Sequence, residues 1–230
     1  MDPARPMFAF EAAGFQEHGQ GHGSVEEMAA HYVKLAREVQ PAGPYRLIGA
    51  SFGGMLAYEM GRQLSLAGQA VPLCALLDTP GPGALPPPLG DDSDAEALSS
   101  LAREWIAIDP ERLRGLSRDA QLQCVLDEAR RTGVDLGFSD VEQGRRLLGI
   151  WKNNVHAMYR YVAPRWDDGE LQFFRAIDGD PRNPERPEST WIDRCRAVRV
   201  EVTTGNHTSM LKAPHALRLG TRLRACLTDH

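Results

Sequence analysis

The chain has 230 residues, of which 42% are hydrophobic and 25% are charged, so a fibrous or disordered chain is excluded. Lys and Arg number 26 against 31 Asp and Glu, and the formal net charge of -5 offers no basic excess to attract nucleic acid.

No membrane or export segment is visible in the sequence. The apolar run at residues 71–77 is far shorter than the roughly 20 residues that span a bilayer. The opening residues show no basic stretch followed by an apolar one, as a secretory signal would. None of the four cysteines forms a C-x-x-C pair, so neither a disulfide framework nor a zinc site is indicated. We expect a cytoplasmic protein without a metal.

The chain begins with a strand candidate and a strongly marked helix. Residues 7–10 are apolar and predict a short strand. Residues 24–40 open with the capping box Ser24-x-x-Glu27 and carry apolar side chains at helical spacing, which predicts a helix.

The next segment has the alternation of a parallel sheet. Residues 45–50 and 71–77 indicate buried strands, and residues 52–67 between them predict a helix that ends at Gly68. A strand, a helix and a second strand in this order favour a βαβ unit.

A change of composition then separates two regions. Residues 80–88 hold five prolines and two glycines and precede the acidic residues 91–94, which is typical of a linker. Beyond it, residues 94–108, 119–132 and 140–162 show helical periodicity with no strand candidate between them. We expect these three helices to be an insertion in the sheet.

Strand candidates return near the end of the chain, at residues 171–177 and 198–202. A final helix is predicted over about residues 214–227, with Pro214 allowed in its first turn. The predicted fold class is therefore α/β, with a mostly parallel sheet flanked by helices and interrupted by a helical insertion.

A G-x-S-x-G motif, Gly49-Ala50-Ser51-Phe52-Gly53, lies at the junction of a predicted strand and helix. In this context it indicates a nucleophile elbow, whose sharp turn exposes the serine at a helix N-terminus. We expect Gly49 and Gly53 to be required, because the turn brings backbone close enough to clash with a Cβ. The backbone N–H of Phe52 is the candidate oxyanion donor. A glycine-rich turn of another βαβ unit is the alternative, whereas a P-loop is excluded.

A nucleophilic serine needs a base and an orienting carboxylate, which in α/β-hydrolases follow in the chain order Ser, Asp, His. Asp78 directly follows the predicted strand at 71–77, and His207 lies in a loop between the last strand and the last helix. Ser51, Asp78 and His207 satisfy this order and form the predicted triad. His215, at the start of the last helix, is the alternative base.

Four segments then carry a family resemblance: QPAGPYRLIGASFGG at 40–54, AYEM at 57–60, LLDTP at 76–80 and GNHTSML at 205–211. They resemble the thioesterase domains that end nonribosomal peptide and polyketide synthases, a branch of the α/β-hydrolases. The resemblance covers nearly the whole chain. It implies one α/β-hydrolase domain over residues 1–230, with a helical lid at residues 86–164.

The resemblance implies that Ser51 accepts a chain as an ester, with His207 as general base and Asp78 as its partner. The implied substrate is an acyl or peptidyl chain on the phosphopantetheine arm of a carrier protein, released by hydrolysis or cyclisation with no other cofactor. Four lid side chains are candidates to line the acyl chamber, with simple packing as the alternative: Trp105, Trp151, Met158 and Tyr159.

The resemblance also implies a strand and a Pro/Gly-rich loop ahead of the region that matches residues 7–14. That loop would supply the second oxyanion N–H, but residues 1–10 contain no Gly-Gly pair. We therefore expect a form shortened at its N-terminus, a degenerate copy, or a domain completed by another chain.

Two other functions stay open on the sequence. A catalytically weak module would bind a carrier protein and hold its product. An oxygen-ester hydrolase would use the same fold and triad on a different substrate, since the triad alone does not distinguish esters from thioesters.

Overall fold

The computed structural model describes residues 6–12, 22–82, 94–102, 106–178 and 186–228. The chain divides into two compact units. The sheet unit comprises residues 1–10, 22–86 and 157–230, and the helical unit comprises residues 11–21 and 87–156. The predicted insertion at 86–164 overlaps the helical unit, while most of the predicted linker at 80–88 lies outside the described residues.

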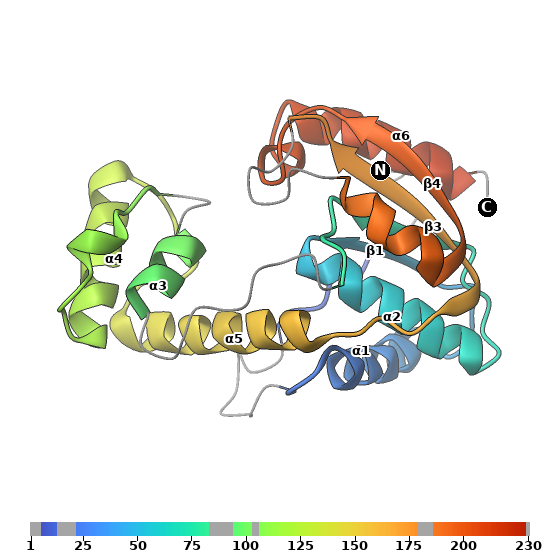
Figure 1. The fold of residues 1–230 in the computed structure, drawn as a ribbon, viewed down its shortest axis with the longest axis horizontal. Coiled ribbons are helices and arrows are strands. Elements are labelled where there is room, and N and C mark those ends of the chain that lie inside the picture. The colour runs from blue at the N-terminus through green and yellow to red at the C-terminus, as the bar shows by residue number, and fades with distance from the viewer. Residues whose placement is uncertain (1–5, 13–21, 83–93, 103–105, 179–185, 229–230) are drawn as a thin grey trace. The chain divides into compact units, whose positions relative to one another are not determined.

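Within the part of the chain that the structure describes, the sheet unit has four parallel strands, β1 (Arg46–Ala50), β2 (Leu73–Leu77), β3 (Trp166–Ala176) and β4 (Cys195–Thr203). Their spatial order is β1-β2-β3-β4 (Figure 1). Ala50 lies beside Leu77, and Leu77 lies beside Phe174, so the carboxyl ends of the strands meet at one edge. The four predicted strands from residue 45 onward are confirmed, although β3 and β4 begin earlier than predicted.

Helices cover both faces of this sheet (Figure 1). On one face, α1 (Val25–Val39) and α2 (Phe52–Leu66) contribute to a core that includes Phe173. On the other face, α6 (His215–Thr228) packs Leu219 and Leu223 into a core that includes Phe174. Adjacent residues of β3 thus enter different cores, as expected for a strand buried on both sides. The predicted α/β class is confirmed.

The Ser24 half of the capping box predicted at the start of α1 is present, and Glu27 binds one residue earlier than the motif requires. The hydroxyl of Ser24 accepts a hydrogen bond from the N–H of Glu27 at 3.2 Å. The Glu27 carboxylate accepts in return from the N–H of Gly23 at 3.0 Å. Two N–H groups that lack partners within the helix are therefore satisfied.

The helical unit contains α3 (Asp94–Ala102), α4 (Arg118–Thr132) and most of α5 (Val141–Arg160). A short 3-10 helix, η1 (Pro110–Arg112), precedes α4. The unit has an apolar core of its own, which includes Leu98, Leu113, Leu122 and Leu148. The last residues of α5, from Ala157 onward, belong to the sheet unit.

One predicted strand is wrong, and one predicted helix is too long. Residues 7–10 do not form a strand, because a strand needs a hydrogen-bonding neighbour and this segment pairs with none of the four described strands. Of the helix predicted over 94–108, the structure describes α3 over Asp94–Ala102, and residues 106–108 are not helical. Asp109 precedes Pro110, a position that disfavours helical backbone. Two further 3-10 helices, η2 (Pro187–Arg194) and η3 (Ser209–Leu211), were not predicted.

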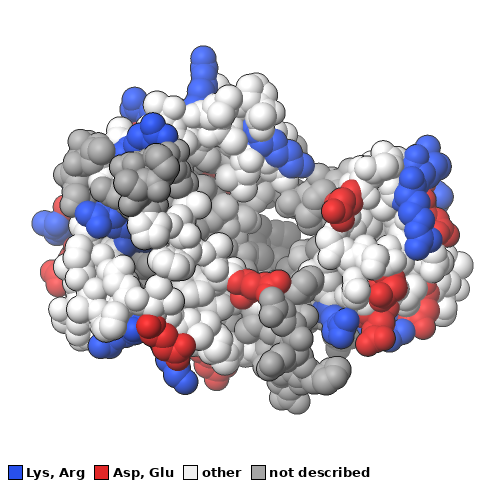
Figure 2. Space-filling model, turned by 180° about the vertical axis from the view of Figure 1, so that it is seen from behind, with Lys and Arg blue, Asp and Glu red and all other residues white. Residues whose placement is uncertain are grey.

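The surface charge concerns the exclusion of nucleic-acid binding, and the helix composition concerns the exclusion of a membrane span. On the face shown in Figure 2, Lys and Arg side chains stand singly or in small groups, with Asp and Glu side chains among them. Among the helices that the structure describes, none is both long and apolar enough to cross a membrane.

A buried carboxylate joins α2 to the chain that follows α5. Glu59 is fully buried and accepts hydrogen bonds from Arg62 at 2.7 and 2.9 Å, from Gln63 at 2.9 Å and from the Tyr161 hydroxyl at 2.9 Å. Burial raises the pKa of Glu59, but these hydrogen bonds outweigh it and hold the pKa below its usual value. The carboxylate is therefore charged and compensated in place.

We expect Glu59→Gln to lower the free energy of unfolding by about 3 kcal/mol, because a buried ion pair loses one partner. Urea denaturation followed by circular dichroism measures the change. Asp167→Asn is the matched control, since it removes an ion pair between exposed side chains of the same unit, Arg165 and Asp167, and should leave stability nearly unchanged. Equal effects of the two substitutions would contradict the role of Glu59.

Candidate active site

Ser51 lies in a sharp turn between β1 and α2. Its φ of 51° and ψ of -126° are rare for a residue with a Cβ. Its N–H donates to the Leu77 carbonyl at 3.0 Å, which extends the contact with β2 one residue beyond β1. Although Ser51 precedes the first residue of α2, its side chain does not cap the helix. The hydroxyl is therefore available to another partner.

Close backbone approach accounts for glycine at position 49. A Cβ on Gly49 would lie 2.0 Å from the carbonyl oxygen of Gly53. The clash predicted at Gly53 itself is not found, because no atom lies within 4 Å of a Cβ built there. Gly54 is more constrained, since its Cβ would lie 1.8 Å from the Thr79 hydroxyl oxygen. The second glycine of the Gly-Gly pair is therefore the one that the packing requires.

Asp78 follows β2 and is held by β3. Its N–H donates to the Phe174 carbonyl at 2.7 Å, and the N–H of Ala176 donates to its Oδ1 at 2.9 Å. The residue is buried, and its φ of 46° is again unusual for a non-glycine residue. These contacts fix one carboxylate oxygen and leave the other, Oδ2, for a different partner.

His207 connects Asp78 with Ser51. Its Nδ1 lies 2.8 Å from Asp78 Oδ2, and its Nε2 lies 2.9 Å from Ser51 Oγ. The structure thus brings the three residues of the predicted triad into one hydrogen-bonded row at the carboxyl edge of the sheet. His215, the alternative base, instead lies 2.9 Å from the Thr204 hydroxyl through its Nδ1.

Phe52 is the first residue of α2 and directly follows Ser51. A backbone N–H at this position has no acceptor within the helix, and the helix dipole places partial positive charge there. The N-terminus of α2 is therefore suited to stabilise negative charge that develops next to the Ser51 oxygen.

The predicted chamber residues have separate surroundings. Trp105 lies outside the described residues. Trp151 packs against the core of the helical unit, whereas Met158 packs against the core of the sheet unit. Tyr159 is 39% exposed. A shared chamber formed by these residues stays a prediction.

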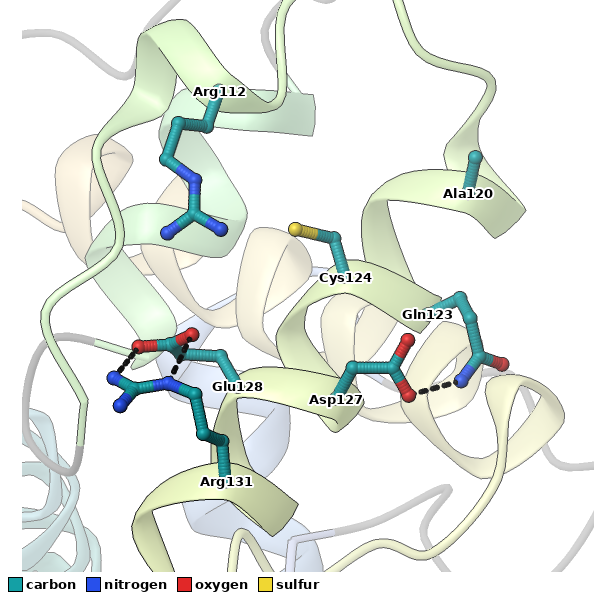
Figure 3. Close-up of a pocket in the computed structure, with 7 residues that line it drawn as sticks. All are labelled: Arg112, Ala120, Gln123, Cys124, Asp127, Glu128 and Arg131. Atoms are coloured by element: carbon teal, nitrogen blue, oxygen red, sulfur yellow. Dashed lines mark hydrogen bonds and ion pairs between the residues drawn. The ribbon is translucent and has the colours of Figure 1, made fainter.

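A pocket on α4 and η1 is distinct from these residues (Figure 3). Within it, Arg131 donates to both carboxylate oxygens of Glu128 at 2.5 and 3.1 Å, and Gln123 donates to Asp127 at 2.8 Å. Four of its polar side chains thus form two hydrogen-bonded pairs. The pocket lies in the helical unit and contains no residue of the predicted triad; its lining consists of Arg112, Ala120, Gln123, Cys124, Asp127, Glu128 and Arg131.

A family model described as "Thioesterase domain" matches residues 2–219. The chain belongs to this thioesterase family. The resemblance noted from the four sequence segments is therefore confirmed. The curated relatives that it matches are larger proteins, and the chain spans between 1% and 26% of the length of those compared.

Three similar proteins illustrate the relationship. Aspulvinone E synthetase melA of Aspergillus terreus is 28% identical over 246 residues, covering 98% of this chain and 26% of melA. The four-domain nonribosomal peptide synthetase holo-AB3403, solved with AMP and glycine, is 28% identical with a TM-score of 0.80, covering 93% of this chain and 16% of that one. The NocB thioesterase domain, solved as a covalent complex with a fluorophosphonate nocardicin G analog, shares the fold, with 21% identity and a TM-score of 0.63 over 94% of this chain and 80% of that one.

The elbow geometry predicts different effects for two glycine substitutions in this thioesterase. Gly49→Ala should prevent folding or abolish labelling of Ser51 by a fluorophosphonate, because its Cβ would overlap the Gly53 carbonyl. Gly53→Ala is the matched control, since its methyl group would enter open space and should keep the wild-type labelling rate. Mass spectrometry of the labelled protein and a thermal unfolding curve measure both. Wild-type labelling of Gly49→Ala would contradict the geometry.

Proposed function

We propose that this protein is a serine thioesterase that releases an acyl or peptidyl chain from the phosphopantetheine thioester of a carrier protein. The observation that carries the proposal is the hydrogen-bonded row Asp78, His207, Ser51 in a chain of the thioesterase family. The row by itself supports acyl transfer by a serine on any fold, and membership of the thioesterase family supports a thioester as the substrate.

The first half of the proposed reaction forms an acyl-enzyme. His207 Nε2 accepts the proton of Ser51 as Oγ attacks the thioester carbonyl carbon. Asp78 accepts a hydrogen bond from Nδ1–H, which keeps Nε2 free of a proton beforehand and stabilises the imidazolium afterwards. The N–H of Phe52 donates to the oxyanion. Collapse then breaks the C–S bond, and the imidazolium gives its proton to the departing thiolate.

The second half releases the chain. Water, or a nucleophilic group of the chain itself, attacks the acyl-Ser51 ester and loses its proton to His207. The imidazolium then returns that proton to Ser51 Oγ as the ester bond breaks. Water gives a free acid, whereas an internal nucleophile gives a ring. The phosphopantetheine arm arrives with the substrate, and no resident cofactor enters these steps.

The relatives support a carrier domain as the partner. They include a "Dimodular nonribosomal peptide synthase" of Bacillus subtilis, 31% identical over 185 residues, of which this chain spans 8%. We also propose a cytoplasmic location for this activity. The second oxyanion donor and the acyl chamber of Trp105, Trp151, Met158 and Tyr159 stay predictions within this proposal.

Removal of the nucleophile tests the proposed function. Ser51→Ala should lower kcat for hydrolysis of an N-acetylcysteamine acyl thioester by at least about 10³-fold, because the covalent route is lost. Ser65→Ala, a serine substitution in the same helix α2, should keep wild-type kcat. A Ser51→Ala protein with full thioesterase activity would falsify the proposal.

A matched pair of substrates tests the thioester preference. The N-acetylcysteamine thioester should be hydrolysed faster than an oxygen ester with the same acyl chain. Faster hydrolysis of the oxygen ester would indicate an esterase instead. Tight binding of a carrier protein by a wild-type protein that fluorophosphonate does not label would indicate a binding module without catalysis.

A further inference from the structure

The loop that carries His207 belongs to neither a strand nor a helix. It leaves β4 after Thr203 and enters η3 at Ser209, and His207 lies between them. Asp78 and Ser51 bind the two ring nitrogens of His207 and not its backbone. The backbone on either side of His207 must therefore be fixed by other contacts if Nε2 is to stay within 2.9 Å of Ser51 Oγ.

The side chain of Asn206 supplies such contacts. Its Oδ1 accepts hydrogen bonds from the N–H of Thr208 at 3.2 Å, from the Thr208 hydroxyl at 3.2 Å and from the N–H of Ser209 at 2.9 Å. All of these donors follow His207, whereas Asn206 precedes it. One side chain thus bridges the backbone before His207 to the backbone after it.

Ser209 binds the backbone of Asn206 in return. Its Oγ accepts from the N–H of Asn206 at 2.8 Å, and the N–H of Met210 donates to the Asn206 carbonyl at 3.0 Å. The reciprocal pattern, in which each of two residues three apart binds the other's backbone N–H, is that of a capping box. Here it encloses His207 without using either of its ring nitrogens.

The loop is tied to the rest of the sheet unit at its other end. The N–H of Asp178 donates to the Gly205 carbonyl at 3.1 Å, and Thr204 binds His215 at the start of α6. Gly205 has a φ of 92°, and a Cβ there would lie 2.8 Å from Ser209 Oγ. These contacts place the segment before His207, and the bridge from Asn206 sets the segment after it.

We propose that Asn206 is a positioning residue, whose side chain, together with Ser209, holds the backbone around His207 so that Nε2 meets the nucleophile. The inference rests on the proposed function of Ser51 and His207. Because Asn206 is exposed, its replacement leaves no cavity and costs only these hydrogen bonds. Loss of the bridge therefore acts on the placement of His207 more than on the folding of the unit.

Paired substitutions at position 206 test the inference. Asn206→Ala should lower kcat about tenfold to hundredfold with little change in KM, because a displacement of about 1 Å in a reacting group has effects of this size. Asn206→Asp keeps an acceptor oxygen in the same place and should restore most of kcat. Thr221→Val, which removes an exposed side-chain hydrogen bond from α6, is the control and should match the wild type. Unchanged kcat in Asn206→Ala, or no recovery in Asn206→Asp, would overturn the inference.

A second readout does not depend on turnover. The proton of His207 Nδ1 that binds Asp78 should give a strongly downfield proton NMR signal in the wild type and in Asn206→Asp. In Asn206→Ala that signal should weaken or broaden while the thermal midpoint changes little. A wild type that lacks thioesterase activity contradicts the proposed function, whereas an unchanged signal in Asn206→Ala contradicts the positioning role.

Discussion

The close approach of α2 to the sheet is the constraint on which the rest of the site depends. Glycines allow it at three points, since a Cβ would overlap Gly53 from position 49, Thr79 from position 54 and the Trp166 ring, at 2.6 Å, from position 61. Because the helix lies so near, its first turn starts directly after Ser51 and directs its positive end at the hydroxyl. At position 49 the overlap is with backbone, so a larger residue there would move the helix and carry Ser51 away from His207.

The second determinant is β3, which contributes no member of the triad. It lies between β2 and β4 and binds Asp78 through the Phe174 carbonyl and the Ala176 N–H. It also pairs along the length of β4, which leads into the His207 loop. Strand register therefore sets how far Asp78 lies from the start of the His207 loop, and the hydrogen bonds within that loop then place the imidazole.

Sequence reasoning located the parts of this structure whose signals are local. The elbow motif and chain order identified Ser51, Asp78 and His207, and the capping box located the start of α1. It failed for residues 7–10, because strand formation depends on a neighbour that no local pattern reveals. Helical periodicity correctly places Trp151 and Met158 in helices, but it does not show that they pack against different cores. The hydrogen bonds of the Asn206 side chain have no sequence pattern and are visible only in the structure.

Separation along the chain has a further consequence for how the enzyme is made. The hydrogen bonds of His207 span 129 residues to Asp78 and 156 residues to Ser51, so the site depends on some of the most non-local contacts in the fold. Such contacts form late, after the loops between them have closed. During synthesis on the ribosome, Ser51 and Asp78 emerge long before His207. A partly made chain therefore lacks the hydrogen-bonded row that these three residues form.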